Sequence, residues 1–240
     1  MSPSPRLTHF LCVPLVTSVS RPQLQANLTT FRTEVTQATA QNPNGIPERA
    51  VRPVGTLHLT LGVMSLLTPA RVEAALTLLR SLDLRGQMPS RERQATDGAS
   101  SRLPPLSVTL RGLESMHDPA KTSVLYVAPV DEDRTLSEFC LKLREAFEAA
   151  DLLVPDTRAL LLHATIINTI YLVGRRSGNG RKRAPKLTID AREMLQKYEA
   201  FEWMRDVRVE RVSICRMGAR AVEGGDEEYV VEGEVAIPEY

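Results

Sequence analysis

An α+β fold with mainly antiparallel sheets is expected for this 240-residue chain on two observations. The first is a pair of apolar, β-branched runs, TLHLTLGVMSLL and ALLLHATIINTIYL, each of which follows a helical segment and a loop. The second is the order of the predicted elements: strand, helix, strand, helix, two strands, helix, strand, helix and two strands. Because one of the two runs stands in each half of the chain, this order also suggests a structural duplication.

The N-terminal half begins with a strand, a helix and a second strand, over residues 8–16, 21–40 and 56–67. The breaker cluster NPNG ends the helix. Thr68 followed by Pro69 predicts the start of another helix, since threonine is a good N-cap and proline suits the first helical position. Residues 83–105, rich in Ser, Gly, Pro and charge, are expected to form a mobile loop.

The C-terminal half is expected to hold more strands than helices. Strands are predicted over 106–110, 123–130, 160–173, 207–217 and 229–237, and a helix over 134–150. A second mobile loop is expected over 174–186. Asp190, with Glu193 three residues later, has the spacing of a capping box and predicts a helix that runs toward Phe201 or Trp203. The aromatic residues at its end are expected to pack in the core.

Composition and charge narrow the class of protein. A formal net charge of +1 excludes a protein that is basic throughout, so any affinity for nucleic acid must come from a local patch. The three cysteines form no CxxC spacing and are typical of reduced, buried thiols in an intracellular compartment. We expect neither a signal peptide nor a membrane span.

Two of the four histidines open the same kind of tripeptide, His58-Leu59-Thr60 and His163-Ala164-Thr165. In an extended strand, residues i and i+2 point to one face of the sheet. Each tripeptide therefore places an imidazole beside a hydroxyl, while the apolar residues between and around them point into the core. Two such pairs in opposite halves of one chain predict a twofold site.

This pairing suits acid–base chemistry at phosphorus. One imidazole can take a proton from the attacking water or hydroxyl while the other protonates the leaving oxygen. The hydroxyls of Thr60 and Thr165 can donate hydrogen bonds to the nonbridging phosphate oxygens. No cofactor is predicted, and neither histidine has a carboxylate at a suitable offset to complete a metal site. The competing interpretation is that these are structural strand histidines.

A basic run follows the second histidine strand. Residues 175–186 hold six basic side chains and no acid, among them Arg181, Lys182 and Arg183. These three residues could bind a nucleic-acid backbone at the mouth of a groove or act as a nuclear localisation signal, or the run could be a solvated loop. The nucleus is slightly favoured over the cytoplasm.

On these motifs the chain resembles the 2H phosphoesterase superfamily, which has two His-x-Thr/Ser motifs. Within it the chain is most similar to the phosphoesterase-like domain of A-kinase anchoring proteins and of activating signal cointegrator complex subunit 1. The likeness rests on THFLCVPL, LHLTLGVMSLL and LHATIINTIY. It implies one bilobed domain over 1–240, with two mainly antiparallel sheets, flanking helices and a central groove lined by both motifs.

The resemblance also implies a function. Members make or break 2′,3′-cyclic or 2′–5′ phosphodiester bonds in RNA or nucleotides without metal. His58 and His163 would be the acid–base pair, and Thr60 and Thr165 would hold the phosphate. The alternative is a non-catalytic nucleotide- or RNA-binding subunit of a transcription-coactivator or DNA-alkylation-repair complex. We expect RNA or a nucleotide as the partner, and the oligomeric state stays open.

Overall fold

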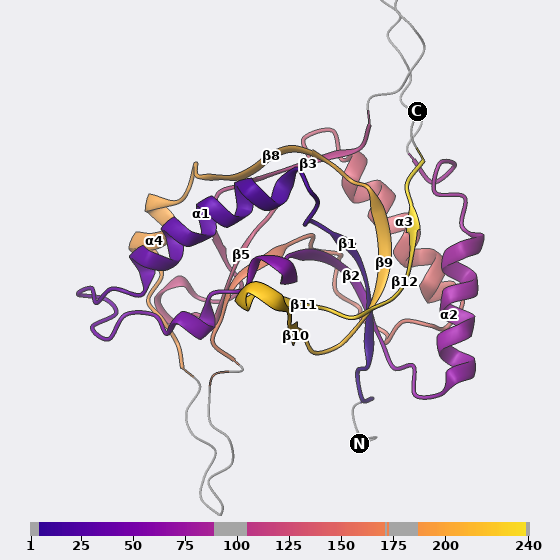
Figure 1. Ribbon diagram of the computed structural model, residues 1–240, viewed down its shortest axis with the longest axis horizontal. Helices are drawn as coiled ribbons and strands as arrows, with labels where there is room; N and C mark the ends of the chain where they lie inside the picture. The colour runs from indigo at the N-terminus through magenta and orange to yellow at the C-terminus, as the bar shows by residue number, and fades with distance from the viewer. Residues whose placement is uncertain (1–4, 89–104, 171, 173–186, 239–240) are drawn as a thin grey trace, which may run out of the picture.

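The computed structural model describes residues 5–88, 105–170, 172 and 187–238. Within these ranges, four-stranded and three-stranded antiparallel sheets are flanked by helices on two opposite sides of the molecule (Figure 1). The predicted α+β class is thereby confirmed. Most of the two expected mobile loops, 83–105 and 174–186, lies outside the described residues.

The first sheet has the order β12-β9-β1-β2, with strands β1 (His9–Pro14), β2 (His58–Met64), β9 (Arg211–Arg216) and β12 (Val231–Ala236). The predicted closing pair is therefore confirmed as β9 and β12, although each is shorter than expected. The first histidine strand, β2, lies at the edge of this sheet.

The second half of the fold holds two three-stranded sheets. One has the order β6-β3-β8, with strands β3 (Ser107–Arg111), β6 (Pro129–Val130) and β8 (Glu202–Arg208). The other has the order β4-β5-β7, with strands β4 (Glu114–Ser115), β5 (Val124–Val127) and β7 (Ala164–Asn168). Gly112 stands between β3 and β4 with a φ of +83°, a conformation that favours glycine. A Cβ atom there would lie 3.0 Å from the Glu199 carbonyl oxygen. The chain can therefore bend here and continue from one sheet into the next.

The two histidine strands occupy matching places in a repeated unit. In the first unit, β1 leads to helix α1 (Ser20–Val35) and then to β2, which pairs antiparallel with β1. In the second, β5 leads to helix α3 (Thr135–Ala149) and then to β7, which pairs antiparallel with β5. The structure thus supports the duplication suggested by the order of elements.

The repeated units exchange their helices. Helix α1 packs on β8 of the second half, where Asn27 donates hydrogen bonds to the carbonyl oxygens of Glu202 and Trp203. Helix α3 packs against β2 of the first half, and helix α2 (Pro69–Ser81) packs against β12 of the same sheet. One continuous apolar cluster consequently spans both halves.

Three predicted elements need correction. The helix that begins near residue 190 is only α4 (Arg192–Lys197), so the extension toward Phe201 or Trp203 was wrong, and Glu202–Arg208 forms β8. Trp203 is fully buried and packs edge-on against Phe31 of α1, with ring centroids 5.0 Å apart. This packing and the pairing of β8 with β3 override the local helical pattern. The expected core packing of the aromatic residues is correct.

The capping box was also wrong. Ala191 is the N-cap of α4 and makes no side-chain cap, while Asp190 accepts a hydrogen bond from the Arg192 N–H at 3.2 Å. Glu193 instead accepts a hydrogen bond from Gln41. Two predicted elements are also too long. The predicted helix over 21–40 ends at Val35, and within the described residues of the predicted strand over 160–173 the paired strand is Ala164–Asn168.

Helix α2 begins as predicted. The Thr68 side chain accepts a hydrogen bond from the Arg71 N–H at 3.3 Å, and Pro69 occupies the first helical turn. The remaining short elements are the 3₁₀ turns η1 (Glu48–Ala50), η2 (Val54–Thr56), η3 (Pro119–Lys121) and η4 (Glu223–Gly225), and the hairpin strands β10 (Arg220–Ala221) and β11 (Glu227–Glu228).

Candidate active site

His58 is the first residue of β2, one residue beyond the end of η2. Its Nδ1 atom lies 2.7 Å from the carbonyl oxygen of Thr56. A carbonyl oxygen only accepts hydrogen bonds, so Nδ1 carries the hydrogen and Nε2 is the nitrogen left to accept a proton or contact a ligand. The backbone two residues upstream thus selects the tautomer.

His163 repeats this geometry in the second half. It stands immediately before β7, and its Nδ1 atom lies 2.8 Å from the carbonyl oxygen of Leu161, again two residues upstream. The two motifs therefore share a backbone contact as well as a sequence pattern. Both rings keep Nε2 for chemistry.

The threonines stand beside a β-bulge in both motifs. Thr60 pairs with Cys12 and Gly62 pairs with Leu11, so the ladder skips Leu61. In the second half, Thr165 pairs with Tyr126 and Ile167 pairs with Leu125, so the ladder skips Ile166. Bulges of this kind bend a strand and redirect its side chains near active sites. The duplication therefore extends to the residue that follows each threonine.

The alternation along each strand determines which side chains face the core. Leu59 and Leu61, like Ala164 and Ile166, are buried, as the strand parity predicted. Thr60 and Thr165 are half-buried on the opposite face, and within the described residues neither hydroxyl is engaged in a hydrogen bond. Their hydroxyls are therefore available to a ligand.

The two histidines interact electrostatically. Strand β2 lies against β7. Burial is the main cause that lowers the pKa of His58; the hydrogen bond to Thr56 opposes this lowering, and the positive charges of Arg52 and of a protonated His163 add to it. The pKa of His58 falls from 6.5 to about 4, so its imidazole is neutral near pH 7.

An aromatic ring stands beside each imidazole. Tyr229 meets His58 edge-on with ring centroids 5.2 Å apart, and Phe10 lies 4.7 Å from the same imidazole. Tyr126 meets His163 edge-on at 5.4 Å, and its hydroxyl donates to Glu114 at 2.8 Å. Burial raises the pKa of Tyr126 to about 12, so this phenol stays protonated. These contacts hold both imidazoles in place.

Arg52 is a site residue that sequence reasoning missed. Its backbone N–H donates to the carbonyl oxygen of Ile166 at 2.8 Å, and its guanidinium donates to the Tyr229 hydroxyl at 3.2 Å. Its backbone is therefore bonded to the strand of the second motif, and its guanidinium brings positive charge close to the first. The only signal in the sequence is an arginine shortly before the first histidine strand, which does not distinguish it from a surface arginine.

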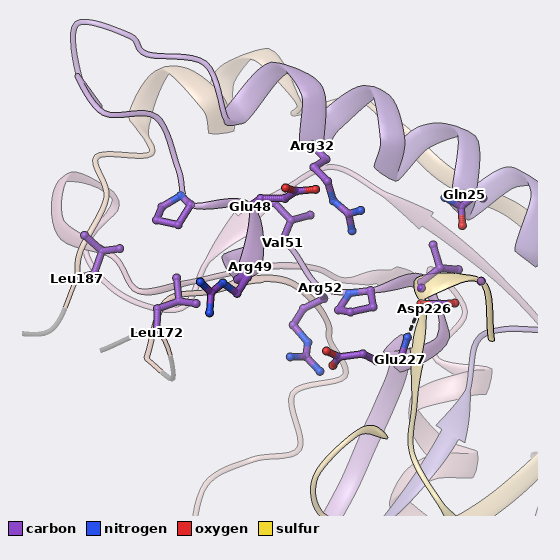
Figure 2. Close-up of a pocket in the computed structure, with 15 residues that line it drawn as sticks. Gln25, Arg32, Glu48, Arg49, Val51, Arg52, Leu172, Leu187, Asp226 and Glu227 are labelled. Carbon is purple, nitrogen blue, oxygen red and sulfur yellow. Dashed lines mark hydrogen bonds between the residues drawn. The ribbon is translucent and has the colours of Figure 1, made fainter. Parts of the chain in front are cut away.

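A cavity of about 1060 Å³ adjoins Arg52 (Figure 2). Its charged lining residues are Arg32, Glu48, Arg49, Arg52, Asp226 and Glu227. Leu172 and Leu187 also line it, and they flank the segment that contains Arg181, Lys182 and Arg183, three residues that lie outside the described part of the chain. A second cavity of about 150 Å³ has His58, Cys12, Cys215 and Tyr229 in its wall.

The described residues contain no group of three or more His, Cys, Asp or Glu side chains that could hold a metal ion. None of their helices has both the length and the apolar surface that a membrane span requires.

The chain matches a protein family along nearly all of its length. A family model described as the AKAP7 2'5' RNA ligase-like domain matches residues 7–237. Activating signal cointegrator 1 complex subunit 1 of Mus musculus is 27% identical over 198 residues, which is 81% of this chain and 51% of that protein. An uncharacterised protein of Schizosaccharomyces pombe, C15D4.13c, is 26% identical over 115 residues, 48% of this chain and 50% of its own. The chain spans about half the length of these relatives.

Solved structures show the same fold. The crystal structure of E. coli LigT complexed with 3'-AMP superimposes with a TM-score of 0.52 at 16% sequence identity, covering 97% of this chain and 99% of that one. At this identity the likeness concerns the arrangement of helices and strands. It agrees with the bilobed α+β fold expected for the two motifs.

Proposed function

Since this chain belongs to the AKAP7 2'5' RNA ligase-like domain family, within the 2H phosphoesterases, we propose that it hydrolyses a 2′,3′-cyclic or 2′-linked phosphodiester on RNA ends or nucleotides. The observation that supports this most is the repeated geometry of His58 and His163. Both rings donate Nδ1–H to a carbonyl oxygen two residues upstream, and both keep Nε2 for proton transfer.

His58 is the proposed general base. Its lowered pKa keeps the imidazole neutral at neutral pH, so Nε2 can take a proton from the attacking water. As the water oxygen bonds to phosphorus, the bond from phosphorus to the ribose 2′ or 3′ oxygen breaks. His163, in its protonated form, is the proposed acid that gives this leaving oxygen its proton. No metal takes part in this proposed reaction.

The proposed phosphate contacts are Thr60, Thr165 and Arg52. The threonine hydroxyls stand two residues after each histidine, on the same face of each sheet, and the Arg52 guanidinium is bonded to Tyr229 beside His58. Donors fixed before the reaction stabilise charge that builds up on the nonbridging oxygens. Changing either threonine to valine should lower kcat by about 10² or more.

The direct test uses a nucleoside 2′,3′-cyclic phosphate in the presence of chelator, with chromatography for the opened monophosphate. His58→Ala and His163→Ala should each lower the rate by about 10²–10⁴. His117→Ala is the matched control, because His117 lies exposed in the turn before η3. Undiminished turnover by the double variant His58→Ala, His163→Ala would overturn the proposal.

A second candidate function is binding without turnover. It is favoured by the relative of Mus musculus, whose name describes a subunit of a complex. For this chain we propose a transcription-coactivator or DNA-alkylation-repair complex. Binding of a mononucleotide that persists with no opened product would support this function. Both functions place RNA or a nucleotide in the same site, in the nucleus or the cytoplasm.

We also propose that the RNA backbone contacts Arg181, Lys182 and Arg183. Their replacement by serine should weaken RNA binding and reduce its salt dependence, since each lost phosphate contact lowers the number of counterions released. Unchanged salt dependence would assign these residues another role.

A further inference from the structure

The cavity of about 1060 Å³ is larger than the reaction needs. Ligand pockets for small molecules measure roughly 300–1,000 Å³, so this space exceeds what one phosphate group requires. It is built by helix α1, the segment before β2, the hairpin turn at η4 and residues next to β7, and Arg52 joins it to the histidine site. The cavity therefore adjoins the proposed active site through Arg52 and has neither histidine in its lining.

Building on the proposed phosphoesterase function, we infer that this cavity binds the nucleotide on the 5′ side of the nucleoside that carries the cyclic phosphate. The preferred substrate is then the end of an oligonucleotide, and a cyclic mononucleotide fills only the histidine site. The charges in the cavity support this subsite, as does one buried donor that has no partner among the described residues.

That donor belongs to Arg32. Its Nε atom is buried and has no hydrogen-bond partner in the described part of the structure. Figure 2 shows its guanidinium directed from α1 toward the segment that carries Arg49 and Arg52. A buried donor left unpaired is costly, and a phosphate oxygen would satisfy it. The three guanidiniums together suit an anion in this space.

The carboxylates in the same lining indicate more than a bare phosphate. Asp226 is already paired with Arg21 at 2.8 Å and accepts a hydrogen bond from the Gly55 N–H at 3.0 Å. Glu48 and Glu227 form no ion pair with any described residue. They can accept hydrogen bonds from base amino groups or ribose hydroxyls. A nucleotide unit offers both the phosphate oxygens and these donors.

The test compares kcat/KM for uridine 2′,3′-cyclic phosphate with kcat/KM for a dinucleotide that ends in the same group. The wild-type protein should favour the dinucleotide about tenfold or more, which corresponds to about 1.4 kcal/mol. Arg32→Gln and Arg49→Gln, singly and together, should remove this preference and leave the mononucleotide rate unchanged. Arg80→Gln, an exposed arginine on α2, is the matched control and should keep the preference.

The outcomes separate the two proposals. Equal kcat/KM for both substrates in the wild-type protein, or a preference that survives in the Arg32→Gln, Arg49→Gln double variant, would overturn the subsite and leave the phosphoesterase function standing. If neither substrate is turned over, the phosphoesterase function fails. The subsite is then tested by calorimetric binding of the same dinucleotide, where the double variant should bind about tenfold more weakly than wild type. Equal binding would overturn it. Since Arg49 is exposed, Arg49→Gln should retain the fold even if Arg32→Gln does not.

Discussion

The backbone N–H of Arg52 donates a hydrogen bond to the carbonyl oxygen of Ile166, 2.8 Å away. Ile166 is the bulge residue that follows Thr165, and Arg52 stands six residues before His58. Val51 also forms an isolated antiparallel bridge with Ile167. The entry to one histidine strand is thus bonded to the other, which keeps the two motifs at a defined separation.

Replacing Arg52 should change the pH profile of the reaction. The charge of Arg52 lowers the pKa of His58, so Arg52→Gln should raise that pKa and move the acid limb of kcat/KM to higher pH. Arg52→Lys is the control, because it keeps a positive charge while losing the planar guanidinium. An acid limb at the same pH in Arg52→Gln and wild type would contradict this assignment.

Stability should fall at acid pH because of His58. Its pKa is 6.5 in the unfolded chain and about 4 in the folded one, so between these pH values only the unfolded chain binds the proton. The free energy of unfolding therefore decreases as the pH falls from about 6.5 toward 4, by at most about 3 kcal/mol from this group. Urea unfolding at several pH values measures this slope.

His58→Gln should flatten that slope, since it removes the titrating group. His117→Gln, at an exposed turn position, should leave the slope as it is in wild type. If His58→Gln keeps the full wild-type slope, another group is responsible for the acid sensitivity.

The N-cap of α2 offers a test of local stability that spares the site. Thr68→Ala removes the hydrogen bond from the Arg71 N–H and should cost about 1 kcal/mol of unfolding free energy. Thr68→Ser retains a capping oxygen and should cost much less. Thermal unfolding measures both, and a stable Thr68→Ala variant would show that Pro69 suffices to start the helix.

Gly62 reports on the contact between β2 and the chain after α3. A Cβ atom at this position would lie 2.6 Å from Leu153 Cδ1, so Gly62→Ala should destabilise the fold by about 1–3 kcal/mol through overpacking. Leu153→Ala in the same chain makes room for the added methyl group. The double variant should therefore lose less unfolding free energy than the sum of the losses in the two single variants. A double-mutant cycle in urea measures this difference.

Much of the active site could be predicted because it depends on local geometry. The alternation of His58, Leu59 and Thr60 determines which side chains share a face of a strand, and the same holds for His163, Ala164 and Thr165. Strand β8 could not be predicted in this way. Trp203 and Phe201 are compatible with a helix, and the pairing of β8 with β3 and its contact with α1 override that local preference.

The sequence was sufficient for the α+β class, the two histidine motifs and their duplication, since these follow from the periodicity of apolar residues along single strands. The tertiary structure decided three things: the bulges at Leu61 and Ile166, the exchange of α1 and α3 between the halves, and the hydrogen bonds of Arg52 to Ile166 and Tyr229. Each of these depends on contacts between residues far apart in the chain, which no periodicity within one segment encodes.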